Sequence, residues 1–119
     1  MEKQDERFPF RERLRRKRDF EQVYEQGAVL RGQHVVLFCL SAGVGERKVG
    51  FVASRKVGGA VSRNRARRRI REAYRKLRTG LPAGAHLVFV ARAGAADATW
   101  DELVAEVADL LRKSGLLTA

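Results

Sequence analysis

The residues best suited to chemistry in this sequence are the arginines of one short segment. Seven of the thirteen residues from Arg63 to Arg75 are arginine, and Glu72 is the one acid among them. A guanidinium group is planar, permanently charged and able to donate two parallel hydrogen bonds to a phosphate. Crowded like charges repel one another, and the phosphates of a bound polyanion relieve that repulsion. The segment therefore predicts contact with nucleic acid, while a solvated amphipathic helix face is the simpler alternative.

The same segment has the periodicity of a long helix over residues 60–78. Apolar residues recur along it at helical spacing and mark one buried stripe: Ala66, Ile70, Ala73, Tyr74 and Leu77. Several arginines fall outside the stripe and must spread over the exposed arc: Arg65, Arg68, Arg69 and Arg71.

A glycine turn leads into this helix, in the segment Ser54-Arg55-Lys56-Val57-Gly58-Gly59. Glycines let the backbone approach a ligand closely, and the free N–H groups at a helix start favour anions. The spacing of a nucleotide-binding P-loop is absent. A phosphate site and a plain helix-starting turn are both compatible with the segment.

Aromatic residues mark a second region of interest. Phe20 and Tyr24 are four residues apart in a predicted helix over 17–26, which is usually a core arrangement. The predicted strand 33–41 is apolar on both of its alternating faces, with Val35, Leu37 and Cys39 on one and Val36, Phe38 and Leu40 on the other. A half-covered sheet leaves aromatic side chains at a groove, where they stack on unpaired bases. The residues alone favour the core over the groove.

Groups for catalysis by the polypeptide itself are scarce. His34 and His86 each begin a predicted strand, and neither belongs to a cluster with metal-ligand spacing. Cys39 lies among apolar residues, which favours a buried small side chain over a nucleophile. No triad and no pair of carboxylates suited to acid–base work is found. The sequence does not resemble that of a self-sufficient catalyst.

Charge is distributed unevenly along the 119 residues. Lys and Arg number 25 against 14 acids, a net charge of +11. Residues 1–78 hold 22 of the bases and 9 of the acids (+13), and residues 79–119 hold 3 and 5 (−2). Such a field predicts a polyanionic partner. The length suits one domain, and the single cysteine excludes an internal disulfide framework and fits the reducing cytoplasm. No membrane span or signal peptide is recognised.

The predicted elements follow the order α-β-β-β-α-β-α, which indicates an α+β fold, a small single-domain α-β sandwich. Residues 1–13 are expected to form a charged flexible arm, and residues 14–119 the folded domain. The strand–helix–strand unit over 48–54, 60–78 and 86–91 suits parallel strands, and the general rule predicts a right-handed crossover. The remaining elements are a short strand or turn at 28–32, a hairpin loop at 42–45 and a helix at 100–113.

A family resemblance emerges from the central motif. Residues 49–74, VGFVASRKVGGAVSRNRARRRIREAY, closely resemble the signature of the bacterial ribonuclease P protein component, centred on the triplet Arg63-Asn64-Arg65. Residues 15–27 resemble the first helix of that family, and residues 86–92 resemble its last strand. The resemblance covers nearly the whole chain from Leu14 to Leu111.

This resemblance implies a small basic subunit of a ribonucleoprotein that removes the 5′ leader from precursor tRNA. The partners would be ribonuclease P RNA and precursor tRNA, with one protein per RNA subunit. The RNA would perform the hydrolysis with Mg²⁺, without an organic cofactor and without stand-alone activity of the protein. The family fold has a left-handed βαβ crossover, contrary to the general rule.

The resemblance also assigns residues to two surfaces. The positions that match the helix contacting the catalytic RNA are Arg63, Asn64, Arg65, Arg67, Arg68 and Arg71. Those that match the cleft for the leader, or its edge, are Phe20, Tyr24, Phe38, Arg55, Lys56 and Arg92. This assignment reverses the local preference for an aromatic core, and it identifies no protein-borne metal ligand. Gly59 departs from the family, which often has a polar residue there. The alternative function is a ribosomal or architectural protein that uses the arginine helix as a general RNA clamp.

Overall fold

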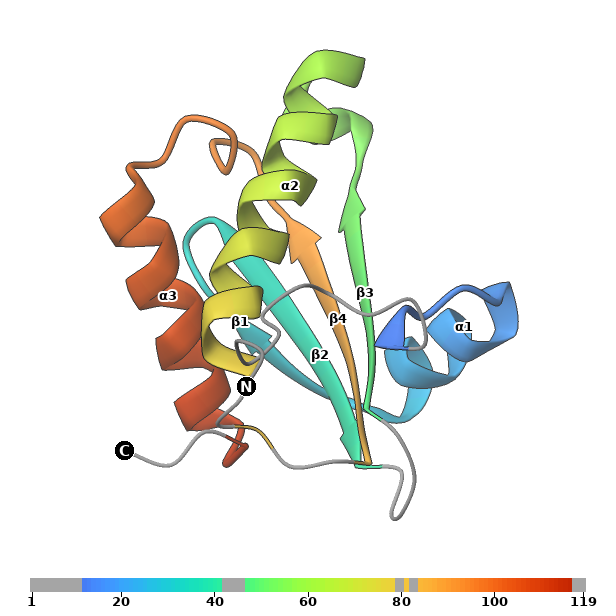
Figure 1. Ribbon diagram of the computed structural model, residues 1–119. Helices are drawn as coiled ribbons and strands as arrows, with labels where there is room; N and C mark the ends of the chain where they lie inside the picture. Colours follow the sequence, from blue (N-terminus) through green and yellow to red (C-terminus); the bar gives the residue numbers. More distant parts are fainter. Residues whose placement is uncertain (1–11, 42–46, 79–80, 82–83, 117–119) are drawn as a thin grey trace, which may run out of the picture.

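The computed structural model describes residues 12–41, 47–78, 81 and 84–116, so the loop predicted at 42–45 lies outside the described residues. The described residues form three α-helices and a four-stranded sheet, whose arrangement is seen in Figure 1. The elements are α1 (Lys17–Gln26), β1 (Ala28–Arg31), β2 (Val35–Ser41), β3 (Lys48–Ala53), a 3-10 turn (Arg55–Val57), α2 (Ala60–Leu77), β4 (Ala85–Ala91) and α3 (Trp100–Lys113). The α+β class and the predicted element order are confirmed. Within the described residues, none of the helices is long and apolar enough to span a membrane.

The sheet has the strand order β1-β2-β4-β3. β2 is antiparallel to both β1 and β4, whereas β3 is parallel to β4. In Figure 1, β3 and β4 both point upward, α2 lies in front of them, and β4 lies to the left of β3. This crossover is left-handed. The right-handed expectation is therefore wrong for this chain, and the expectation from the family resemblance is correct.

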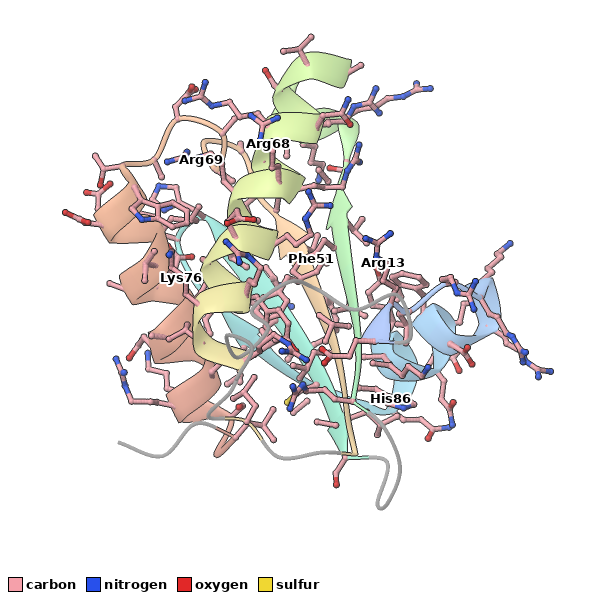
Figure 2. The ribbon with its side chains drawn as sticks, viewed as in Figure 1. Arg13, Phe51, Arg68, Arg69, Lys76 and His86 are labelled. Atoms are coloured by element: carbon pink, nitrogen blue, oxygen red, sulfur yellow. The ribbon has the colours of Figure 1, made fainter. Side chains whose placement is uncertain are left out.

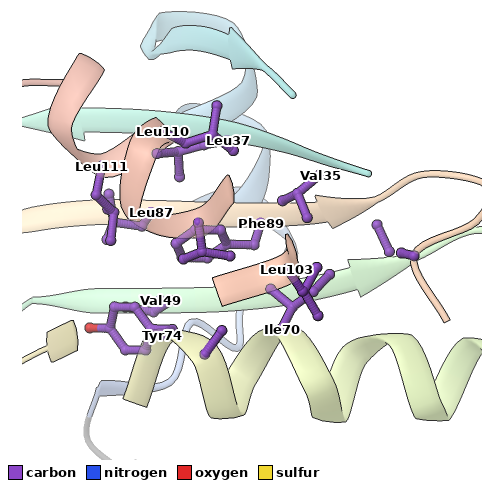
Figure 3. Close-up of a cluster of buried hydrophobic side chains, with 14 of the residues drawn as sticks. Val35, Leu37, Val49, Ile70, Tyr74, Leu87, Phe89, Leu103, Leu110 and Leu111 are labelled. Atoms are coloured by element: carbon purple, nitrogen blue, oxygen red, sulfur yellow. The ribbon is translucent and has the colours of Figure 1, made fainter. Parts of the chain in front are cut away.

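One face of the sheet is sealed by α2 and α3. Alternate strand residues point toward these helices, and the apolar stripes of the two helices meet them. Tyr74 and Phe89 are the largest side chains of this core, and both are fully buried. Figure 3 shows its main members: Val35, Leu37, Val49, Ile70, Tyr74, Leu87, Phe89, Leu103, Leu110 and Leu111. The helix α2 thus has its predicted buried stripe.

Among the described residues, the opposite face of the sheet is covered by α1 and by Leu14 of the segment before it. Leu14, Val23 and Val88 form a small buried cluster there. Six further apolar residues pack around the cluster without being fully buried: Phe20, Tyr24, Phe38, Leu40, Val52 and Val90. A ten-residue helix is about 15 Å long and about 10 Å wide, whereas the seven-residue strands β2 and β4 each run about 23 Å, so α1 can cover only part of this face. This face therefore stays partly open.

The helix α3 begins with a capping box. The Thr99 hydroxyl accepts a hydrogen bond from the Glu102 N–H, and the Glu102 carboxylate accepts one from the Thr99 N–H. Such reciprocal caps satisfy two backbone donors at the helix start. Trp100 is 37% exposed, although its helical spacing from Leu103 and Val107 puts it on the apolar face of this helix. It occupies the first turn, before the stripe of Leu103 and Val107 reaches the core.

The described chain begins with a packed segment. The Leu14 N–H donates to the Val49 carbonyl at 2.9 Å, so this segment extends the outer edge of β3. Glu12 is 6% exposed and is paired with Arg78 and Arg47. The Tyr74 hydroxyl also donates to the Glu12 carboxylate at 3.2 Å. Glu12 and Arg13, which fall within the predicted arm, thus make contacts with the folded domain.

Candidate nucleic-acid interface

The arginines of α2 point in three directions around the helix. Successive helical residues are about 100° apart, so residues four apart lie near one another and adjacent ones diverge. One group faces the segment before α3, a second faces the β3 edge, and a third points outward.

Arg65 and Arg69 hold the loop between β4 and α3. Arg65 Nε donates to the Ala96 carbonyl at 2.9 Å. Arg69 Nη1 donates to the carbonyls of Ala95 and Ala96, and its Nη2 donates to Ala98. Figure 2 shows Arg69 on the side of α2 near this loop. Buried carbonyls need donors, so these two arginines have a structural role in addition to any RNA contact.

Arg67 and Arg71 face the edge of β3. Together with Arg13 they line a shallow groove, whose other lining residues are Leu14, Phe20, Val49, Gly50 and Phe51. Arg67 also donates to the Asn64 side-chain carbonyl. The groove brings guanidinium groups from two separate parts of the chain close to two aromatic rings.

The outward direction carries Asn64, Arg68 and Arg75. Asn64 and Arg68 are both exposed. Arg75 pairs with Glu72 at 2.6 Å, and the hydrogen bond from Arg75 lowers the pKa of the Glu72 carboxyl. Glu72, the lone acid of the helix segment, is thus neutralised locally. Arg63, half-buried, lies in the first turn. The predicted RNA-binding residues are therefore divided among the three directions: Asn64 and Arg68 point outward, Arg67 and Arg71 line the groove at β3, and Arg65 is bonded to the loop before α3.

The turn before α2 has the conformation that glycine permits. Gly58 has φ of 139°, a backbone state essentially restricted to glycine. The Ser54 hydroxyl accepts from the Lys56 N–H at 3.3 Å, which fixes the 3-10 turn. Gly59 occupies the N-cap of α2 and supplies no side-chain cap. Arg55 and Lys56 are both exposed at this turn.

The second predicted surface lies on the partly open face of the sheet. Tyr24 and Phe38 meet edge-on, with ring centroids 4.9 Å apart, and Phe20 lies 6.4 Å from Tyr24. All three rings are half-buried. Burial raises the pKa of the Tyr24 phenol, so this hydroxyl stays protonated at neutral pH. The three aromatic residues that the resemblance assigns to a cleft are therefore adjacent and partly exposed.

Gly50 allows Phe20 to reach the sheet. A Cβ atom at Gly50 would lie 2.5 Å from Cε1 and 2.6 Å from Cζ of the Phe20 ring. Those distances are far below van der Waals contact. The ring thus lies directly on the backbone of β3, and Gly50 determines its height above the sheet.

Cations surround one end of this face. The carboxyl ends of β1, β3 and β4 coincide there, because these strands run in one direction. Arg55 and Lys56 follow β3, and Arg92 follows β4. Arg92 Nη1 donates to the Gly32 carbonyl at 2.8 Å. Arg31, the last residue of β1, is exposed at the same end and was not singled out from the sequence. Its strand was too short to show a pattern.

The histidines and the cysteine have structural surroundings. His34 Nδ1 lies 3.0 Å from Glu106 Oε1, and Glu106 Oε2 accepts from the N–H groups of His34 and Val35. Glu106 thus ties α3 to the start of β2, a role that its place on a helix face did not indicate. Burial raises the pKa of the half-buried Cys39 thiol. Within the described residues no group of three or more His, Cys, Asp and Glu is placed to hold a metal ion.

Comparison with known proteins agrees with the family resemblance of the sequence. The family model described as Ribonuclease P matches residues 8–115. The ribonuclease P protein component of Chloroflexus aurantiacus is 43% identical over 108 residues, 90% of this chain and 80% of that protein. The protein of the same name from Symbiobacterium thermophilum is 41% identical over 106 residues, 88% and 92% of the two chains.

Solved structures agree in fold. The RNase P protein of Staphylococcus aureus superimposes with a TM-score of 0.79 at 22% identity, covering 90% of this chain and 98% of that one. The RNase P protein from Thermotoga maritima has a TM-score of 0.75 at 27% identity, covering 86% and 96%. With the sequence match spanning most of the residues and the fold shared, the chain belongs to the ribonuclease P protein family.

Proposed function

We propose that this chain is the protein subunit of ribonuclease P and assists removal of the 5′ leader from precursor tRNA in the cytoplasm. In this proposal α2 binds the ribonuclease P RNA through Arg63, Asn64, Arg65, Arg67, Arg68 and Arg71. The leader lies against Phe20, Tyr24 and Phe38, with Arg55, Lys56 and Arg92 near its phosphates. The RNA subunit carries out hydrolysis with Mg²⁺, and the protein binds and orients the substrate. One protein joins each RNA.

The partly open aromatic face is the observation that carries this proposal. A protein that only clamps RNA backbone needs cations, since phosphate contacts supply its affinity. It has no need for three adjacent, partly exposed aromatic rings on one face of the sheet. Stacking of unpaired bases on aromatic rings is the usual way to bind a single strand. The 5′ leader is a single strand attached to a folded tRNA, so this face suits it.

The first test is a cleavage assay at low Mg²⁺ and near-physiological salt, with precursor tRNA, a bacterial ribonuclease P RNA, and the protein present or absent. We expect the protein to restore accurate removal of the leader, and the protein without RNA to leave the substrate intact. Binding of the RNA with no change in cleavage would favour a general clamp. Site-specific cleavage by rigorously RNA-free protein would overturn the RNA-based assignment.

The two proposed surfaces are tested separately by paired substitutions. Phe20→Ala should weaken binding of leader-bearing substrate more than binding of mature tRNA. Arg68→Ala should weaken binding of ribonuclease P RNA. It should also lower the slope of log affinity against log salt concentration by the amount expected for about one phosphate contact. Arg112→Ala is the matched control, because Arg112 is exposed in the last turn of α3. Equal losses for Phe20→Ala on both substrates would favour the clamp.

A further inference from the structure

The strand β1 presents an apolar and a cationic side chain on the same face as the aromatic cluster. In the register of the sheet, Val29 lies opposite Phe38 and Arg31 lies opposite Val36. Leu30, between them, packs into the sealed core on the other face, beside its partner Leu37. Because side chains alternate along a strand, Val29 and Arg31 both project toward the partly open face.

Both side chains are accessible. Val29 is 40% exposed, which is unusual for a valine on a sheet face, and Arg31 is exposed. The helix α1 ends at Gln26 and packs on β2 and β4 rather than on β1. Within the described residues the Arg31 guanidinium has no hydrogen-bond or ion-pair partner. Both side chains are therefore available to contact a ligand.

The strand residues on this face carry charge that suits a polyanion, and Asp19 of α1 acts on His86, at the end of the face away from Arg31. The strand positions on the partly open face carry cations and apolar groups and no carboxylate: Val29, Arg31, Val36, Phe38, Leu40, Lys48, Gly50, Val52, His86, Val88 and Val90. Arg92 is fixed at the turn after β1 by its bond to Gly32, so Arg31 lies at a turn that already holds a second cation. An anion on Arg31 would therefore lie close to the turn that binds Arg92.

The position of β1 in the sheet determines which part of a strand would reach it. β3 is one edge of the sheet, next to the groove that Arg67 and Arg71 line, and β1 is the opposite edge. If the leader enters from the side of α2 and the groove, the strand order requires it to pass β3, β4 and β2 before it reaches β1. Its upstream nucleotides, furthest from the cleavage site, would arrive there last.

We propose that Val29 and Arg31 form a separate subsite for an upstream nucleotide of the single-stranded leader, with the phosphate on Arg31 and the base or ribose on Val29. The subsite rests on the proposed function, because it extends the same cleft. It predicts that leader length matters beyond the nucleotides held by Phe20, Tyr24 and Phe38.

The test measures affinity of the reconstituted holoenzyme for a series of precursor tRNAs whose leaders are shortened one nucleotide at a time, ending with mature tRNA. The variants are Arg31→Ala, Arg31→Lys and Val29→Ser, with Arg112→Ala as the control for loss of one exposed charge. For long leaders we expect Arg31→Ala to weaken binding about five-fold and to reduce the salt slope by about 0.7. Short leaders and mature tRNA should be unaffected, and Arg31→Lys should recover most of the loss.

The outcomes separate the subsite from the function beneath it. If Arg31→Ala matches Arg112→Ala at every leader length while the leader still strengthens wild-type binding, the subsite is wrong and the function stands. An equal loss on mature tRNA would assign Arg31 to the tRNA body and also overturn the subsite. If no leader strengthens wild-type binding, the proposed function itself fails. Thermal unfolding of each variant shows that any loss is not a folding defect.

Discussion

The two faces of the sheet differ in how completely helices cover them. On the face under α2 and α3, the side chains of Leu37, Leu87 and Phe89 are fully buried. On the other face, Phe38, Val52 and Val90 pack against α1 and keep part of their surface exposed. The strands are the same, so the difference lies in the area of the covering helices. Full coverage gives stability, and partial coverage leaves apolar surface for a ligand.

The buried phenol of the covered face illustrates the same contrast. Burial raises the pKa of Tyr74, whose hydroxyl is held between Arg47 and Glu12. Tyr24 on the open face is half-buried and makes ring contacts with Phe20 and Phe38. One tyrosine completes a buried polar network, and the other presents part of its ring to solvent.

The largest expected effect is on the covered face. Phe89→Ala removes a fully buried ring that stacks against Phe51 and contacts Tyr74, with centroid distances of 5.6 and 5.7 Å. We expect a loss of about 3–5 kcal/mol in the free energy of unfolding, because a cavity replaces the ring. Urea unfolding followed by circular dichroism measures it. A loss below about 1 kcal/mol would contradict the description of this face as the main core.

Phe38→Ala should cost less stability than Phe89→Ala and should instead weaken binding of the leader. Phe38 is half-buried, so we expect roughly half the stability loss of Phe89→Ala. Loss of a stacking ring is worth about 1–3 kcal/mol in single-strand binding, so affinity for leader-bearing precursor should fall by about ten-fold or more. Binding of mature tRNA is the internal control. A variant that loses stability and retains leader affinity would show that this ring is only core.

Gly50→Ala tests the height of Phe20 above the sheet. The new methyl group would overlap the Phe20 ring, and relief of such overpacking costs about 1–3 kcal/mol. We expect leader affinity to fall with stability, because the ring must move. Gly59→Ala is the matched control: nothing lies within 4 Å of its added Cβ, and its N-cap position predicts a cost below about 1 kcal/mol. Equal losses of stability and of leader affinity in the two variants would show that Gly50 does not position Phe20 in the cleft.

Local patterns were sufficient to predict most of the elements. The ranges of α1 and α3 follow from their apolar periodicity and flanking residues, and α2 ends one residue earlier than predicted. The hand of the β3–α2–β4 crossover could not be predicted in this way, because it depends on how α2 docks on the sheet rather than on any residue pattern. The general rule gave the wrong hand. Only the resemblance of residues 49–74 to a known family supplied the right one.

The residues of the site could be picked out by type, but their burial and their partners could not be predicted, because both depend on how the elements pack. Phe20, Tyr24 and Phe38 stand out as aromatic residues, yet their periodicity equally fits a core, and the extent of burial depends on the size of α1. Arg65 and Arg69 look like any other arginines of the run until the carbonyls of residues 95–98 are placed beside them. Glu106 and Arg31 gave no sequence signal, because their roles depend on partners or strand registers far away in the chain.

The smallest expected effect is a pH dependence on the open face. Burial, with help from Lys48 and against the effect of Asp19, lowers the pKa of His86 below its ordinary value of about 6.5. The unfolded chain then binds this proton more readily than the folded chain does, so stability falls as the pH drops below about 6.5.

His86→Gln removes the titrating group. We expect urea midpoints of wild type to fall more than those of His86→Gln between pH 7.5 and 5.5. Because His86 is only half-buried, water limits the difference, and a fully sealed face would give a larger one. Parallel pH curves for the two proteins would mean that this end of the face is as open to solvent as the end beside Arg92.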